Sequence, residues 1–349
     1  MHPFVIDPHH LPPPSALTGA VITQALRVPG GGRLRKGQVI DPAALDLIAR
    51  LDHPVHAIRL DPGEIPEDQA ARRLAALAIG SGLTAREPVQ SRVNIIAATK
   101  GLLRVDPEAV EVVNRHEPLA LFTVLDRLPV VPGKIVAGAK IGTVAMPEAT
   151  LRHVEELVAS RKRPILQVKP YQPHLVGVVV TEGLAEKLRD RFEQSVRQKM
   201  SWYGSSILRF DYVPNQGHAV STAIESLLAD GASLILTAGG NMMDPLDPTL
   251  VAMPDLAAEV VRLGAPAHPG SMFWLADLNT RDTSIVNLAS CSMYSKATVA
   301  DLVLPWIMAG ERVTSADIAS LGYGGLLDRD MGWRFPNYEI ETVDEPDEI

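Results

Sequence analysis

The sequence has 349 residues, of which 46% are hydrophobic and 21% charged, and its formal net charge is -8. This composition is typical of a globular protein and excludes a disordered or fibrous chain. The acidic balance and an aromatic content of 5% argue against nucleic-acid binding, which needs basic grooves with stacking aromatic side chains. No stretch approaches the roughly 18 apolar residues of a membrane helix. One cysteine excludes an internal disulfide and favours a cytoplasmic location.

The first part of the chain is expected to combine a lead-in with a small α+β region. Residues 1–14 are rich in His and Pro, which predicts a flexible lead-in and no secretory signal. Residues 15–88 mix short strands with two helices, one beginning at Pro42 and one over 67–78. The glycine triplet 30–32 lacks a strand-then-helix context, so it predicts a turn in preference to a phosphate loop.

Residues 89–165 predict a β-rich, barrel-like region, because short apolar runs alternate there with Gly and Pro. A helix over 147–160 is expected to close it.

Residues 174–315 predict an α/β domain with a parallel sheet. The runs LVGVVVT and SLILTA are continuously apolar, which indicates strands buried on both faces. Helices are expected over 184–203, 218–230, 255–263 and 296–308. Strands that alternate with helices of this length indicate βαβ units. Residues 326–349 then form an acidic tail that carries six of the eight net negative charges.

Ligands of such a sheet bind beyond the carboxyl ends of its strands. Three loops leave those ends: one at Thr181, one over 237–248 and one over 290–295. The sequence therefore places the chemistry of the protein on these three loops.

The loop over 237–248 is the most informative of the three. Gly239 and Gly240 follow a buried strand, so their amides could face a phosphate. Asp244 and Asp247 lie three residues apart and could share a hydrated divalent cation. Helix capping explains Asp247 equally well, because Pro248 follows it.

The last loop holds the single cysteine, Cys291, between Ser290 and Ser292. A thiolate there could ligate a metal or hold a ligand, whereas a free cysteine is more often a small buried hydrophobe. Lys296 opens the next expected helix, where it could pair with a phosphate or lie on a solvated face.

Several segments resemble the molybdopterin-binding domain of molybdenum cofactor biosynthesis proteins, a family that includes the molybdenum insertases and gephyrin. They are VVVTEG, LTAGGNMMDPLDPT, HPGSMFWLADL and IVNLASCSMYSKATVADLVLPWIMAGERVT. The resemblance is greatest to an insertase-like subgroup and extends over nearly the whole chain. It implies a three-layer α/β domain at the C-terminus, preceded by the smaller α+β and β-rich regions.

The resemblance implies binding of molybdopterin or the molybdenum cofactor, which could carry a nucleotide, together with Mg²⁺. It implies that Asp247 and Asp244 are the catalytic and metal-binding residues. The residues that it places in the cofactor site are Thr181, Thr237, Gly239, Gly240, Asn241, Met242, Pro269, Gly270, Ser271, Ser290, Cys291, Ser292 and Lys296. A homo-oligomer, either dimer or trimer, and a client molybdoenzyme are further implications.

Two departures from the family pattern bear on activity. Many relatives have Val-Pro-Asp-Asp after the second strand, and here the segment is Val213-Pro214-Asn215-Gln216, whose neutral Asn215 cannot supply the same charge to a cation. The usual Leu-Pro-Gly near the last strand is Leu288-Ala289-Ser290. These changes favour a cofactor carrier over an active insertase. A metal-dependent nucleotide pyrophosphatase and a non-catalytic oligomeric scaffold are the alternative functions.

Overall fold

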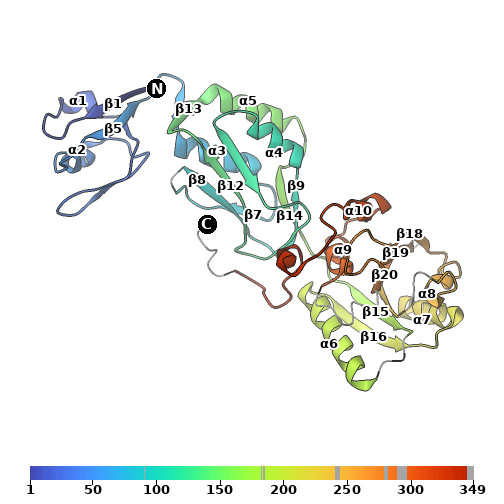
Figure 1. The fold of residues 1–349 in the computed structure, drawn as a ribbon. Helices are drawn as coiled ribbons and strands as arrows, with labels where there is room; N and C mark the ends of the chain where they lie inside the picture. Colours follow the sequence, from blue (N-terminus) through green and yellow to red (C-terminus); the bar gives the residue numbers. More distant parts are fainter. Residues whose placement is uncertain are drawn as a thin grey trace.

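The computed structural model describes residues 1–89, 91–181, 183, 185–239, 244–278, 282–288 and 297–343. Figure 1 shows three bodies that follow one another along the chain, from blue through green to red. Antiparallel sheets build the N-terminal part of this mixed α/β protein, and a six-stranded sheet with parallel strands builds the C-terminal part. Within the residues just given, no helix has the length and apolar character needed to cross a membrane.

The N-terminal body is a three-stranded antiparallel sheet with a small hairpin and two short helices. Its elements are β1 (His2–Ile6), α1 (Pro14–Leu17), β2 (Val21–Ile22), β3 (Leu26–Arg27), β4 (Arg33–Leu34), α2 (Pro42–Ile48) and β5 (Val55–Arg59). Strand β1 falls in the stretch that we expected to be a flexible lead-in. All five of its residues pair with β5, and Ile6 is buried in the core of this body. A short apolar run next to His and Pro therefore supplies an outer strand of the sheet.

The described residues of the middle body form antiparallel sheets of four, three and two strands, together with three helices. Its elements are β6 (Glu64–Pro66), α3 (Glu67–Ala78), β7 (Leu83–Ala85), β8 (Arg92–Ala97), β9 (Gly101–Val105), α4 (Pro107–Asn114), β10 (Leu119–Thr123), β11 (Pro129–Val130), β12 (Ile135–Ile141), β13 (Ala145–Pro147), α5 (Glu148–Ala159) and β14 (Leu166–Pro170). The sheet orders are β10-β12-β8-β7, β11-β9-β14 and β13-β6. The Gly80 amide donates to the Leu166 carbonyl and the Val168 amide to the Ser81 carbonyl, so the four-stranded and three-stranded sheets meet beside β7 and β14, and the barrel-like arrangement stays a prediction. Helix α3 shares one core with these strands, so the expected boundary after residue 88 falls inside that core.

The C-terminal body is a six-stranded sheet flanked by helices. Its elements are β15 (Leu175–Val180), α6 (Glu186–Trp202), β16 (Ser206–Tyr212), α7 (Gly217–Ala229), β17 (Leu234–Ala238), α8 (Pro248–Val251), β18 (Glu259–Leu263), β19 (Trp274–Leu278), β20 (Thr283–Leu288), α9 (Val299–Met308) and α10 (Ser315–Ser320). The strand order is β16-β15-β17-β20-β19-β18. The first four strands are parallel, while β19 and β18 each run antiparallel to their neighbour. The sheet is therefore mixed, and the expectation of a parallel sheet holds for four strands.

The helix expected over 255–263 is wrong, because strand β18 occupies Glu259–Leu263. Leu256, Val260 and Leu263 have the spacing of a helix face, which produced the error. The β-branched pair at 260–261 favours a strand, and β19 offers a free edge with which to pair. Tertiary pairing thus outweighs the local pattern.

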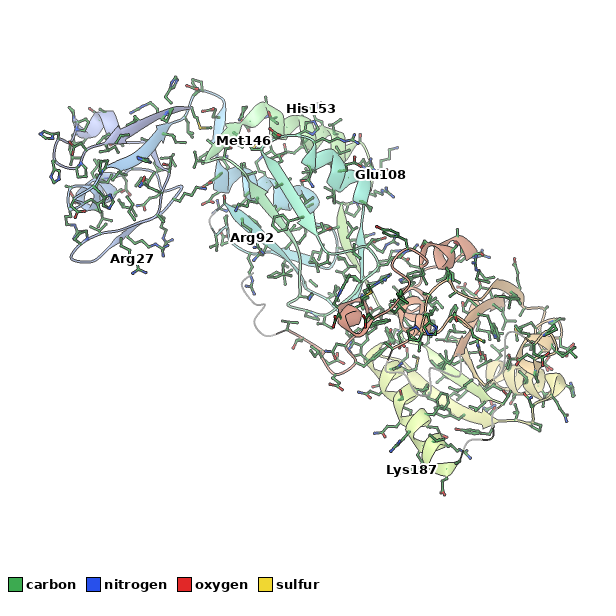
Figure 2. All side chains as sticks on the ribbon, viewed as in Figure 1. Arg27, Arg92, Glu108, Met146, His153 and Lys187 are labelled. Atoms are coloured by element: carbon green, nitrogen blue, oxygen red, sulfur yellow. The ribbon has the colours of Figure 1, made fainter. Side chains whose placement is uncertain are left out.

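The middle and C-terminal bodies are joined by ion pairs and by the C-terminal segment 327–343, which includes η2 (Arg329–Arg334). Glu311 of the C-terminal body forms ion pairs with Arg104 and Lys169 of the middle body. Figure 1 shows the C-terminal segment returning toward the middle body. In Figure 2, Arg27 lies in the N-terminal body and Lys187 at the far end of the C-terminal body.

Asp106 is a buried carboxylate of the middle body that accepts hydrogen bonds from a backbone amide and two arginines. It caps α4 by accepting from the Ala109 amide, and it also accepts from Arg161 at 3.1 Å and Arg163 at 2.7 Å. Burial opposes ionisation of this carboxyl, but the hydrogen bonds from Arg161, the Ala109 amide and Arg163 outweigh burial and lower its pKa.

We expect Asp106→Asn to destabilise α4 and β14 by about 2 kcal/mol, because the cap survives while the charge-assisted bonds weaken. Hydrogen exchange of the amides in these elements measures this loss. Because the pKa of Asp106 is lowered in the folded protein, its ionised form stabilises the fold fully above the pKa of the unfolded chain. This contribution is lost as the pH falls through the folded-state pKa, so the stability difference between wild type and Asp106→Asn should shrink there. Asp41→Asn is the matched control, since Asp41 caps α2 without an arginine partner among the contacts of the described chain. Equal losses in the two variants would contradict the role of the arginines.

Candidate functional site

Three parallel strands of the C-terminal sheet end side by side. Val180 of β15 pairs with Ala238 of β17, which pairs with Leu288 of β20. The chain continues this alignment past the strands, because the Thr181 amide donates to the Ala238 carbonyl at 3.0 Å. We call the edge formed by these strand ends and the loop 269–271 the carboxyl edge.

The antiparallel strand β19 begins at the same edge, because Leu275 pairs with Val286 near the end of β20. The loop before β19 therefore brings Pro269, Gly270 and Ser271 to the start of α9, where the Val299 amide donates to the Pro269 carbonyl at 3.2 Å. Gly270 has a φ of +108°, and a Cβ there would lie 2.7 Å from the Val299 nitrogen. This contact requires glycine at position 270.

Two threonines of the carboxyl edge differ in their hydrogen bonding. The Thr237 hydroxyl is fully buried and donates to Asn287 Oδ1 at 3.1 Å, while the Asn287 amide donates to the Met272 carbonyl at 3.4 Å. The Thr181 hydroxyl is also buried, but no group in the described part of the chain bonds to it. It is a buried donor at the edge of the sheet for which the described residues supply no acceptor.

Asn287 is a residue that our sequence reasoning missed. It is 3% exposed and orients Thr237 from the neighbouring strand. The available signal was an asparagine in the otherwise apolar end of the run SIVNL, since a buried amide needs a partner.

The two predicted metal-binding aspartates lie in one turn but have different surroundings. Asp247 is 3% exposed and caps α8, because its Oδ1 accepts from the amide of Thr249 at 2.9 Å and from the Thr249 hydroxyl. Asp244 is exposed and accepts from the Leu246 amide at 2.9 Å. Among the described residues, no group of three or more His, Cys, Asp or Glu side chains is placed to hold a metal ion. The metal role of this pair stays a prediction.

Part of the predicted site lies outside the described residues. Gly239 is described, with a φ of +89°. The predicted ligand-binding residues for which the structure gives no description are Gly240, Asn241, Met242, Ser290, Cys291, Ser292 and Lys296.

A buried carboxylate at the start of α9 is a second feature that our sequence reasoning missed. Asp301 is 1% exposed, and its Oδ2 accepts from the Thr298 amide at 2.8 Å in a capping box. Lys199 of α6 contacts Asp301 Oδ1 at 2.6 Å. A cavity of about 20 Å³ beside this pair is large enough for one water molecule. The Thr-x-x-Asp spacing was the signal that could have revealed the cap.

No protein-family model matches the chain, and no curated protein matches it. The chain is similar to a solved structure named "Putative molybdenum cofactor biosynthesis protein from Corynebacterium diphtheriae". That structure is 19% identical, covers 41% of this chain and 100% of its own, and gives a TM-score of 0.29.

Replacing Asp247 by asparagine distinguishes a capping role of this residue from a metal-binding role, because asparagine caps a helix about as well as aspartate but carries no charge. We expect Asp247→Ala to lower the free energy of unfolding by about 1 kcal/mol and Asp247→Asn to leave it nearly unchanged. Thermal unfolding of both variants measures the cap. Ligand binding that depends on Mg²⁺ in the wild type should lose that dependence in Asp247→Asn. Identical Mg²⁺ dependence in the two proteins would assign Asp247 to the cap alone.

Proposed function

We propose that this protein binds molybdopterin or the molybdenum cofactor at the carboxyl edge and acts as a carrier in cofactor biosynthesis or delivery. The C-terminal body is then a molybdopterin-binding domain of the three-layer α/β type. The sequence segments that resemble this family, VVVTEG and LTAGGNMMDPLDPT, contain Thr181 and Thr237 at the ends of β15 and β17. Bound molybdopterin would supply the dithiolene that chelates molybdenum.

The observation that carries the proposal is the buried Thr181 hydroxyl, which has no partner among the described residues. A buried donor without an acceptor costs about 1–3 kcal/mol, and an anionic ligand at this edge would supply the missing acceptor. The adjacent strand supports such a ligand, because Gly239 follows β17 with a φ of +89° and leaves the backbone open to close approach. A phosphate of the ligand fits this combination of a hydroxyl donor and bare backbone.

The surroundings of Asp247 favour the carrier role over an insertase. One of its carboxylate oxygens already accepts from two groups of Thr249. Metal-assisted cleavage would need this oxygen, or its neighbour, to face a cation. In the carrier, the edge holds and shields the ligand, and a client molybdoenzyme receives it. A homo-oligomer and a cytoplasmic location belong to the same proposal.

Purification from a host that makes molybdopterin should yield protein with bound pterin, detected by fluorescence after oxidative release, and with molybdenum, detected by mass spectrometry. The same protein from a host without molybdopterin synthesis is the control and should yield neither. Absence of both at stoichiometric sensitivity would refute the proposal. Turnover of ADP-ribose without pterin would favour the nucleotide-hydrolysing alternative.

Thr181→Val should weaken ligand retention without lowering the stability of the protein. Removing a buried hydroxyl that bonds to none of the described residues should leave the ligand-free protein as stable as wild type or slightly more so. Losing one hydrogen bond to the ligand should weaken retention about threefold to tenfold. Thr123→Val in β10 of the middle body is the matched control and should change neither. Unchanged retention in Thr181→Val would remove the hydroxyl from the site.

A further inference from the structure

We propose that Tyr338, carried by the C-terminal segment 327–343, is a positioning residue of the carboxyl edge. Its hydroxyl donates to Asp301 Oδ1 at 2.8 Å and so holds the carboxylate that caps α9. The start of α9 in turn holds the loop 269–271. The consequence for ligand retention rests on the proposed function, whereas the effect on α9 does not.

Asp301 distributes its hydrogen bonds between two tasks. Its Oδ2 accepts from the amide of Thr298 at 2.8 Å and lies 3.4 Å from the Thr298 hydroxyl. Its Oδ1 accepts from Lys199 and Tyr338. Without the tyrosine hydroxyl, Oδ1 of this buried carboxylate keeps Lys199 as its one hydrogen-bond partner among the described residues. The adjacent cavity of about 20 Å³ gives the carboxylate room to turn or to take up a water molecule.

A turn of the Asp301 carboxylate would reach the proposed ligand site through two contacts. The cap residue Thr298 and its neighbour Val299 both lie against Gly270. The Val299 amide also donates to the Pro269 carbonyl. Loosening the cap therefore releases the loop that forms one side of the carboxyl edge.

Residues 340–343, at the end of the C-terminal segment, are fixed to the interface between the middle and C-terminal bodies, which we call the seam. The Val343 amide donates to the Pro132 carbonyl at 2.8 Å, and the Trp202 indole donates to the Ile340 carbonyl at 2.9 Å. Lys100 of the middle body pairs with Glu341. Contacts at the seam therefore decide where Tyr338 lies, so the segment links the docking of the two bodies to the carboxyl edge.

The chain offers a matched control in Tyr171, which belongs to the same aromatic cluster as Tyr338, because both rings contact Trp202 and Tyr203. Its ring lies 5.5 Å from Trp202 and 4.8 Å from Tyr203, measured between centroids. Its hydroxyl is buried and has no hydrogen-bond partner in the described part of the chain. Tyr338→Phe and Tyr171→Phe thus remove the same atom from one cluster, but only the first removes a bond to Asp301.

The first measurement is hydrogen exchange of the amides of residues 299–302 in ligand-free full-length protein. Tyr338→Phe should speed their exchange about tenfold or more, since a hydrogen bond to a charged group is lost, while Tyr171→Phe should change it less than about twofold. Exchange in the strands of the middle body reports on global stability and should stay the same. Equal rates in Tyr338→Phe and wild type would overturn the proposal, as would equal acceleration in both variants.

The second measurement is the rate at which pterin leaves protein isolated from a molybdopterin-producing host, followed by fluorescence. Tyr338→Phe should release it at least about threefold faster than wild type and Tyr171→Phe at the wild-type rate. If wild type binds pterin and Tyr338→Phe releases it no faster, the link to the edge is refuted. If wild type holds no pterin but exchange at 299–302 still responds, the proposed function fails and the positioning of α9 by Tyr338 stands.

Discussion

A helix that is buried on every side cannot satisfy its terminal amides with water, and α9 is such a helix. All ten of its residues are buried between the C-terminal sheet and the middle body. Its first amides need acceptors from the protein, so the chain places a carboxylate, Asp301, where carboxylates are rarely found. That carboxylate needs donors of its own, which come from α6 and from the C-terminal segment. One capping requirement thus draws together three parts of the chain.

The mixed character of the C-terminal sheet decides what surrounds the carboxyl edge. In a fully parallel sheet, each strand would contribute only the loop that follows it. Because β19 is antiparallel to β20, the loop that precedes β19 also reaches this edge. The edge is therefore built from the ends of β15, β17 and β20 and from the loop 269–271, which packs on α9. The antiparallel orientation of β19 thus brings the loop 269–271 to the carboxyl edge, in addition to the loops that follow the parallel strands.

The sequence was informative where the hydrophobic pattern and the tertiary environment agree. The helix expected over 67–78 has those bounds in α3, and the continuously apolar runs became the buried strands β15 and β17. It was misleading for 255–263, where pairing at a sheet edge overrode a helical spacing. For the site, the position of the threonines at strand ends was predictable. The bond of Thr237 to Asn287 and the bonds of Lys199 and Tyr338 to Asp301 were not, because they join residues between 37 and 102 positions apart and depend on how the helices pack.

The joint between the N-terminal and middle bodies rests on few groups. Val21, Ile58 and Ala145 form a buried cluster against which Leu60 and Val144 pack. Lys36 contacts the buried carboxylate of Glu67 at 2.9 Å, and the Met1 ammonium pairs with Glu64 at 2.9 Å. Opening this joint would cost the burial of these side chains, about 1.5–3 kcal/mol for each large aliphatic one. Opening would also return the Glu67 carboxylate to water, which offsets part of that cost. The N-terminal body is thus attached to the middle body through a small buried cluster and a few ion pairs.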